Sequence, residues 1–379
     1  MDVQFTEEQD FLRTNAKSLL TKEAPISLVR ELMDSEHSCS EELYSKMAEL
    51  GWTGLIFPEE YGGMGMDIVS LCVLLEEQGR ALAPTPFLSS VVMAGICILE
   101  AGSAAQKEEY LPSIIDGSKI GTLAFFENNG QWHASDVSLE AKANGDEFVL
   151  TGTKRFVPDA GRADFLIVPA KVSGDEGVTL FLVDPKAPGV TVRGVAYSDQ
   201  TRKVFEISLD GVKLSTKDML GKCGKSTAAL ARVLDITRVA LCAEMTGGAQ
   251  AVLDMSVEYA TTRKQFGVAI GSFQAIQHKC ADMYVAVEGS RSATYYSAWS
   301  LQEHTDKSSI DAHKAKAFCS DAFNLVSAHG IQIHGGFGYT WEADLHLYFK
   351  RCRASEEAFG NGSWNREQIA ASLLDDPAS

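Results

Sequence analysis

The period of the hydrophobic residues changes twice along this chain of 379 residues. Up to about residue 115, apolar side chains recur three and four positions apart, as in "EELYSKMAELGWTGLI", which is typical of amphipathic helices. Between about residues 118 and 220 they alternate, as in "KVFEISLDGVKL", which predicts strands joined by Gly, Pro and Asp turns. From about residue 226 the helical spacing returns. The order of helices, strands and helices indicates the α+β class.

These changes of period predict three domains. An N-terminal α-helical domain would cover residues 1–117, a central β domain residues 118–225, and a C-terminal helical domain residues 226–379. Because no helices alternate with the central strands, we expect an antiparallel sheet and no doubly wound nucleotide fold. The long helical segments of the last third are expected to pack as antiparallel partners in a bundle.

The charge of the chain limits its partners. Its 34 Lys and Arg residues are outnumbered by 51 Asp and Glu residues, which gives a net charge of −17. Nucleic acids and anionic membranes both attract clustered Lys and Arg, so we expect neither as a partner. We interpret the acidity as a contribution to solubility.

No targeting, membrane-spanning or metal-binding pattern is evident. The opening stretch "MDVQFTEEQDFLRTNAKSLL" carries acids and no long apolar core, and no apolar run is long enough to cross a bilayer. The eight cysteines are scattered without a CxxC pair, and the histidines lack the spacing of a metal site. We therefore predict a protein of the reducing cytoplasm that holds no metal.

One segment combines a cation, an aromatic ring and an amide. In "TTRKQFGVAIGSFQAIQHKCADM", Arg263 follows a long helical pattern, Phe266 opens a turn, and Gln274 lies in the first turn of the next helix. Arg can bind a pyrophosphate, Phe a planar ring and Gln polar edges, so the set fits an anionic, planar ligand. Alternatively, the cations complement the dipole at the end of the preceding helix. The residues alone leave both interpretations open.

Several stretches together resemble the acyl-CoA dehydrogenase family of flavoproteins. They are the segment above, "LGWTGLIFPEEYGGMG" and "IQIHGGFGYTWEADLHLYFKRCRA", and the match extends over essentially the whole chain. The resemblance implies an N-terminal helical domain, a central antiparallel β-barrel-like domain and a C-terminal four-helix bundle. It also implies FAD as the cofactor, an acyl-CoA substrate, an electron-transferring flavoprotein as acceptor, and assembly into homo- or heterotetramers.

The resemblance assigns cofactor contacts residue by residue. Arg263 and Phe266 would reach the FAD of the adjacent subunit, and Gln274 its diphosphate or adenosine part. One further segment would let the neighbour's backbone approach the adenine end, because its glycines have no side-chain bulk. The residues implied there are Gln332, Gly335 and Gly336.

Three positions of the β domain match flavin contacts of the family. Phe156 stands where a Trp usually packs on the flavin ring, and Pro158 where a Thr usually lies near its reactive nitrogen. Phe keeps the capacity to stack, whereas Pro retains only its carbonyl. Ser135 matches a serine of the Thr-Glu-Pro…Gly-Ser-Asp loop, which reads "FFENNGQWHASD" here.

The reaction implied by the resemblance removes a proton from Cα of the thioester while a hydride leaves Cβ for the flavin. It requires donors at the thioester carbonyl and a carboxylate base in a dry pocket. The base usually lies in a Tyr-Glu-Gly-Thr turn, at the position of Gly360, or just before a CoA-contacting Arg matched by Arg238, at the position of Thr237. Both positions lack a carboxylate, although the Gly360 N–H can still donate to the thioester carbonyl. The resemblance also implies that Arg238 and Thr237 contact the CoA substrate.

Glu244 is the candidate base. It lies in the apolar run "VALCAEMTGGA", on the same helical face as Thr237 and roughly 10 Å from it. A Glu in such a run costs free energy to bury unless it has a partner or a purpose. An internal salt bridge or a polar partner at a subunit interface explains it equally well, and a base here would need a differently placed substrate.

Two further acids, Glu356 and Glu357, come directly before the turn. The stretch "RCRASEE" has the pattern of a polar helix. We expect both carboxylates on a solvated face, where Arg351 and Arg353 can pair with them.

Three functions remain open. The first is a FAD-dependent acyl-CoA dehydrogenase, and the ending "AFGNGSWNREQIA" resembles subunits of α2β2 family members that act on steroid side-chain CoA esters. The second is a non-catalytic partner subunit that completes the FAD site of a paired chain. The third is different flavin chemistry on the same scaffold, because a fold alone does not define a reaction.

Overall fold

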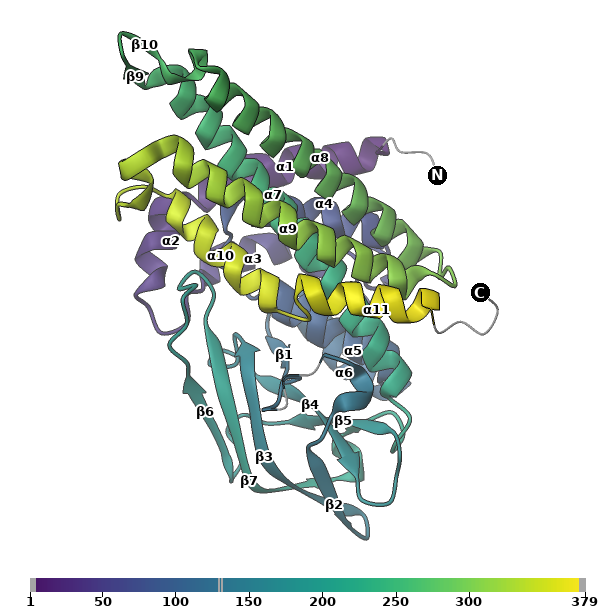
Figure 1. Ribbon diagram of the computed structural model, residues 1–379. Coiled ribbons are helices and arrows are strands. Elements are labelled where there is room, and N and C mark those ends of the chain that lie inside the picture. The colour runs from purple at the N-terminus through teal and green to yellow at the C-terminus, as the bar shows by residue number, and fades with distance from the viewer. Residues whose placement is uncertain (1–4, 129, 131, 375–379) are drawn as a thin grey trace. The chain divides into compact units, whose positions relative to one another are not determined.

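The computed structural model describes residues 5–128, 130 and 132–374, which divide into two compact units (Figure 1). The division passes through the long helix α7 (Thr227–Thr262), between Thr237 and Arg238. One unit, here the helical unit, is formed from segments within Met1–Arg30, Ile68–Ala83 and Arg238–Ser379. The other, here the β unit, is formed from Glu31–Asp67 and Pro84–Thr237.

The helical unit is built around a bundle. The helices α8 and α9 lie side by side and antiparallel, and α10 and α11 pack on α9 (Figure 1). The first helix, α1, starts with a capping box in which Thr6 and Gln9 bond each other's backbone N–H groups. Besides α7 from Arg238 onward, the helices are α1 (Glu7–Glu23), α4 (Ile68–Ala81), α8 (Gln274–Gln302), α9 (Ser308–His334), α10 (Leu345–Glu357) and α11 (Gly362–Leu374).

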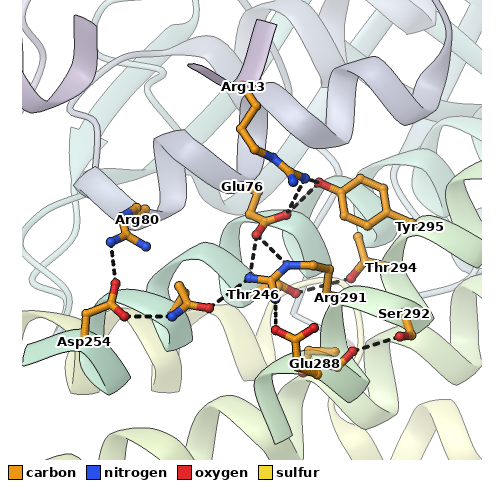
Figure 2. Close-up of polar contacts among 12 residues, drawn as sticks. Arg13, Glu76, Arg80, Thr246, Asp254, Glu288, Arg291, Ser292, Thr294 and Tyr295 are labelled. Atoms are coloured by element: carbon orange, nitrogen blue, oxygen red, sulfur yellow. Dashed lines mark hydrogen bonds and ion pairs between the residues drawn. The ribbon is translucent and has the colours of Figure 1, made fainter. Parts of the chain in front are cut away.

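A polar network ties four of these helices together (Figure 2). Glu76 of α4 is 5% exposed, and its carboxylate accepts Nε of Arg291 at 3.0 Å and the hydroxyl of Tyr295 at 2.6 Å, both from α8. Arg13 of α1 lies 3.7 Å from the same carboxylate. Because each charge has partners of opposite sign, the network can be buried within the bundle.

The β unit contains one mixed sheet. Its strands run in the order β6-β7-β3-β2-β4-β5-β8, and β1 pairs with β4. They are β1 (Gly121–Leu123), β2 (Glu140–Asn144), β3 (Glu147–Pro158), β4 (Phe165–Val172), β5 (Val178–Val183), β6 (Val190–Gly194), β7 (Val204–Ser215) and β8 (Met219–Leu220). The helices of this unit are α3 (Glu41–Glu49), a π-helical segment (Leu88–Gly95), α5 (Ile96–Ala101) and α6 (Ala104–Ile115), while α2 (Ile26–Met33) crosses between the units.

The α+β class and the order of helices, strands and helices are confirmed. The sheet is antiparallel, as expected, except that β1 and β2 each pair with β4 in parallel. The physical reason is chain direction: β3 runs opposite to β2, and the turn after β3 reverses the chain again. Alternating apolar residues reveal a strand but not its partner, so the sequence could not show this.

The β unit has its own apolar core. Strands β3, β4, β5 and β7 point alternate side chains inward, and the core includes Leu150, Val168, Phe181, Ile207 and Val212. The division into domains 1–117, 118–225 and 226–379 remains a prediction, because the compact units follow different boundaries. Within the described residues, no helix combines the length and the apolar character that crossing a membrane requires.

Candidate active site

The turn between α10 and α11 contains Gly360, the position predicted to have lost the catalytic carboxylate. Phe359 and Gly360 have φ angles of 57° and 105°, in the left-handed region that favours glycine. Asn361 then caps α11, because its Oδ1 accepts the Trp364 N–H at 3.0 Å. The backbone therefore leaves the helical conformation just after α10 ends, and α11 begins at Gly362.

Position 360 requires glycine for reasons of space as well as conformation. A Cβ atom there would lie 2.4 Å from Cε3 of Trp364 and 3.0 Å from Nδ2 of Asn365. Trp364 thus fills the space that a longer side chain at Gly360 would need. The absence of a carboxylate at this position is built into the packing of the turn, and a Gly360→Glu substitution alone would clash.

Two cations hold the carbonyl groups of the turn. Arg238 is 3% exposed, and its Nε donates to Phe359 O at 2.9 Å. Lys316 is fully buried, and its Nζ donates to Glu356 O and to Gly360 O, each at 2.9 Å. The local charge around this turn is therefore positive on the side of its carbonyl groups.

Lys316 is a candidate that the sequence analysis missed. It lies on an apolar stripe of α9 with the buried residues Ala312, Cys319 and Phe323. A charge on such a stripe is a signal of a buried ion with a specific partner. The partner itself was not readable, because Lys316 and Gly360 are 44 residues apart in the chain.

The Gly360 N–H is an available donor. Gly360 is buried, and within residues 132–374 its N–H has no hydrogen-bond acceptor. Buried N–H groups without an acceptor are rare, so this group is suited to an acceptor that arrives from outside the chain. Arg238 bonds the carbonyl of the same peptide group, which strengthens the N–H as a donor.

The two residues predicted to contact CoA are both buried on α7. Thr237 has no exposed surface, and its hydroxyl donates to Val233 O at 2.7 Å within the helix. The guanidinium carbon of Arg238 lies 5.2 Å from the centroid of the Trp364 ring. Both side chains thus have partners inside the protein, and their contact with CoA remains a prediction.

Glu244 is 7% exposed, as its apolar run indicated. Its backbone touches α4 directly, because a Cβ atom at Gly79 would lie 2.1 Å from Glu244 O. Gly247 permits the same close approach, since its Cβ atom would lie 1.8 Å from Glu76 O. Two glycines therefore fix where Glu244 lies against α4, while its role as a base stays a prediction.

The acids before the turn behave largely as expected. Arg353 lies 3.1 Å from a carboxylate oxygen of Glu356, and Glu357 is exposed. The expectation for Arg351 was wrong, because it is 5% exposed. It follows buried Leu347 by one helical turn and so belongs to the inner face of α10.

The predicted cation, ring and amide lie around one hairpin of the helical unit. Strands β9 (Lys264–Gln265) and β10 (Val268–Ala269) follow α7, and Phe266 stands at the tip, 92% exposed. Arg263 is exposed at the base of the hairpin, where its carbonyl accepts the Ile270 N–H at 2.8 Å. Gln274 is exposed at the first position of α8.

The second predicted cofactor segment lies at the end of α9. Gly335 has a φ of 61°, and a Cβ atom at Gly335 or Gly336 would meet open space. Gln332 is exposed, and its carbonyl accepts the Gly335 N–H. This segment is therefore a bare stretch of backbone that another molecule can approach closely.

An aromatic stack joins the two segments. The ring of Tyr259, on the last turns of α7, stacks on His334 with a centroid distance of 4.2 Å. The Arg263 N–H donates to Tyr259 O at 2.8 Å, and His334 directly precedes Gly335. A cavity of about 250 Å³ lies beside the stack and is lined in part by Phe337. The hairpin and the glycines thus lie at the same end of the helical unit.

The three predicted flavin contacts of the β unit occupy irregular backbone. Phe156 lies at a bulge of β3 with a φ of 50° and is 45% exposed. The carbonyl of Pro158, the one polar group that proline retains, accepts the hydroxyl of Thr122 at 2.8 Å. Ser135 is exposed in a short 3-10 turn (Ala134–Asp136).

A buried ion pair organises the loop before Ser135, and the sequence analysis missed it. Glu127 accepts Nζ of Lys154 at 2.6 Å and the backbone N–H groups of Ser138 and Leu139 at 2.9 and 3.1 Å. Lys154 has no exposed surface. Coulomb attraction and hydrogen bonds from Lys154 hold the pKa of Glu127 below its usual value, although burial opposes them. The altered loop therefore keeps a fixed anchor.

Each unit carries residues that fit part of a large planar cofactor with a diphosphate. Phe156 and Phe266 expose rings that proteins usually bury, each within its own unit. Arg263 offers an exposed cation for a diphosphate, and Gly335 and Gly336 leave room for a closely approaching group.

Comparison with known proteins agrees with this geometry. The N-terminal, middle and C-terminal domain families of acyl-CoA dehydrogenases match residues 6–118, 122–212 and 227–374. A probable acyl-CoA dehydrogenase of Bacillus subtilis, YngJ, is 32% identical over 99% of this chain and 100% of its own length.

Two solved structures are similar in fold. A variant of the Tcur3481-Tcur3483 steroid ACAD matches with a TM-score of 0.89 at 32% identity, over 98% of this chain and 99% of that one. The ChsE4-ChsE5 complex from Mycobacterium tuberculosis matches with a TM-score of 0.92 at 29% identity, over the full length of both chains. The chain belongs to the acyl-CoA dehydrogenase family, whose members are FAD-binding oxidoreductases.

Proposed function

We propose that this chain is a FAD-dependent acyl-CoA dehydrogenase that oxidises the Cα–Cβ bond of an acyl-CoA thioester. The observation that carries the proposal is the buried Gly360 N–H, which has no acceptor within residues 132–374 and belongs to a peptide group bonded by Arg238. A donor of this kind stabilises the negative charge that develops on a thioester carbonyl when Cα loses a proton. FAD, when bound, supplies the acceptor for the hydride that leaves Cβ.

We propose cofactor contacts in each of the two units, taken separately. Arg263 and Phe266 would reach the FAD of the adjacent subunit, and Gln274 would contact its diphosphate or adenosine part. Gln332, Gly335 and Gly336 would accept the adenine end of a cofactor bound by a neighbouring subunit. In the β unit, Phe156 would stack on the flavin ring, with Ser135 and the Pro158 carbonyl at its edge.

Anaerobic titration of the purified protein tests the proposal. A working dehydrogenase should carry FAD and lose its visible flavin absorbance when an acyl-CoA is added. The panel should contain butyryl-CoA, palmitoyl-CoA and a steroid side-chain CoA thioester. Bound FAD that no member of the panel reduces would favour different flavin chemistry on the same scaffold.

Glu244 is the proposed base, because it is buried on α7 and both usual positions lack a carboxylate. Glu244→Gln keeps the shape and removes the basic group. We expect the rate of flavin reduction at saturating thioester to fall by at least about 100-fold, with FAD still bound. Glu367→Gln, on an exposed position of α11, is the control. Full turnover by Glu244→Gln would remove this assignment and leave a structural role.

The alternative is a partner subunit that completes the FAD site of a related chain. The packing of Trp364 against Gly360 favours it, because no carboxylate can occupy the usual position. Under this alternative, the chain purified alone would be colourless and would gain FAD only when it is expressed with a related dehydrogenase subunit. Similarity to the ChsE4-ChsE5 complex makes such pairing a concrete possibility to test.

A bulky, steroid-type CoA ester is the proposed substrate class. The ending of the chain resembles subunits that act on such esters, and the similarity to a steroid ACAD supports the same class. We further propose assembly as a homo- or heterotetramer, an electron-transferring flavoprotein as electron acceptor and a cytoplasmic location. Faster flavin reduction by butyryl-CoA than by the steroid thioester would argue against the bulky class.

A further inference from the structure

Lys316 carries a buried charge to which the proposed reaction gives no role. Its side chain has no exposed surface, and its hydrogen bonds go to neutral oxygen atoms. An ammonium group loses several kcal/mol of hydration when it is buried, so the position would be more stable with an apolar residue unless the charge has a task. The contacts of Nζ identify that task.

All three N–H bonds of the ammonium can be assigned. Nζ lies 2.9 Å from Glu356 O, 2.9 Å from Gly360 O and 3.3 Å from the hydroxyl of Ser320. A protonated Lys has three donors and a neutral one has two. The arrangement therefore uses the charged form completely.

The two carbonyl groups belong to different parts of the turn. Glu356 is the last residue but one of α10, where the negative end of the helix dipole favours a cation. Gly360 lies beyond the end of that helix and directly follows Phe359, and both residues have a positive φ. One ammonium group thus ties the end of α10 to the far side of a turn whose backbone conformation is not favoured by itself.

The same turn presents the donor that the proposed function needs. The carbonyl before the Gly360 N–H accepts Arg238, and the carbonyl after it accepts Lys316 and Nδ2 of Asn365, the latter at 2.8 Å. Cations on both flanking carbonyl groups fix the orientation of the N–H between them. They also polarise the two peptide groups, because hydrogen bonds in a chain strengthen one another.

We propose that Lys316 is a positioning residue for the acyl-CoA thioester: its ammonium group holds the Phe359–Gly360 turn so that the Gly360 N–H meets the thioester carbonyl. The link to the thioester rests on the proposed function, whereas the hold on the turn does not. Lys316 itself touches neither the substrate nor the reacting atoms.

The charge of Lys316 is sensitive to alkaline pH. Burial lowers its pKa from 10.5 to about 8. Loss of the proton leaves two donors for three acceptors, so the hold on the turn weakens above about pH 8. The charged or titratable groups that face Nζ are Arg238 and Cys242 on α7, Cys319 on α9, and Glu356 and Cys352 on α10.

Hydrogen–deuterium exchange of the peptide that spans residues 356–366 tests the hold without any substrate. Lys316→Met should reduce its protection by about 10-fold or more at pH 7, because two carbonyl groups lose a charged donor. Lys316→Arg should retain most of the protection. Lys314→Met, which removes an exposed Lys paired with Asp311 on the same helix, should change nothing. Unchanged protection in Lys316→Met would overturn the proposal.

Flavin reduction tests the link to the thioester. Lys316→Met should lower the limiting reduction rate by about 10-fold or more with little change in FAD content, and Lys316→Arg should restore most of it. A normal limiting rate in Lys316→Met, with a loosened turn, would overturn the positioning role. If the wild-type flavin is reduced by no thioester, the proposed function fails while the exchange experiment still decides whether Lys316 holds the turn.

The wild-type chain supplies a further test if Lys316→Met does not fold. Protection of the same peptide, corrected for intrinsic exchange, should decrease between pH 7 and about 9.5 in the wild type and remain level in Lys316→Arg. Equal pH dependence in the two proteins would contradict a role for the Lys316 proton.

Discussion

At the scale of single residues, Gly360 and Trp364 decide what the turn can do. The glycine adopts a φ of 105°, and the indole occupies the space beside it. Conformation and packing therefore impose the same residue type at this position. A single substitution could therefore not place a carboxylate at position 360 unless Trp364 moved.

Gly360→Ala should destabilise the protein by about 2–4 kcal/mol, because a Cβ atom meets Trp364 and the φ angle is unfavourable for alanine. Thermal and urea unfolding of the variant measure the loss. Gly362→Ala is a matched control, since its Cβ atom would meet the ends of two side chains, Nη1 of Arg366 at 3.0 Å and Oδ1 of Asp321 at 3.4 Å. Adding Trp364→Ala should relieve part of the loss, and strict additivity of the two substitutions would show that the contact does not matter.

At the scale of elements, the crossing of α4 and α7 sets the place of Glu244. Gly79 and Gly247 bring the two helix backbones together, with no room for a Cβ atom on either side. Such close contacts transmit displacement, because a packed interior cannot absorb a methyl group without movement. A larger residue at this crossing should therefore displace Glu244 itself.

Gly79→Ala should lower the stability of the helical unit by about 1–3 kcal/mol, because its methyl group would displace the Glu244 backbone. If Glu244 is the base, the limiting rate of flavin reduction should fall as well, while FAD content stays level. Unfolding curves and rapid-reaction kinetics measure the two effects. A normal melting temperature would mean that the helices part easily, and the crossing would then not position Glu244.

The sequence was informative about segments and weak on the contacts between them. The period changes near residues 118 and 226 fall close to β1, which begins at Gly121, and α7, which begins at Thr227. Burial of Glu244 followed from its apolar neighbours. Two contacts could not be predicted from the sequence: the parallel pairing of β1 with β4 and the hydrogen bond from Lys316 to Gly360. The hydrophobic period is a local property, whereas these contacts join distant segments.

At the scale of the whole molecule, buried titratable groups couple stability to pH in opposite directions. Burial lowers the pKa of Lys154 and of Lys316 to about 8. Burial raises the pKa of Cys39 and of Cys352 to about 12, and it also raises that of Cys97. Between pH 8 and 10.5 the unfolded chain keeps lysine protons that the folded chain has released. The two lysines therefore make the free energy of unfolding increase as the pH rises through this range. Above pH 9 the unfolded chain releases thiol protons that the folded chain keeps, which lowers stability.

The melting temperature should therefore rise slightly from pH 8 to about 9 and fall above about 10, since each fully shifted group changes the free energy of unfolding by about 1.4 kcal/mol per pH unit. Calorimetry under reducing conditions, which keep the thiols free, measures this profile. Lys316→Arg should lose part of the rise, because its charge does not titrate in this range, and Cys352→Ala should make the fall shallower. A melting temperature that declines steadily from pH 8 in the wild type would show that neither lysine is neutral in the folded chain at pH 9. The buried ammonium group of Lys316 would then persist throughout the range in which the protein is folded.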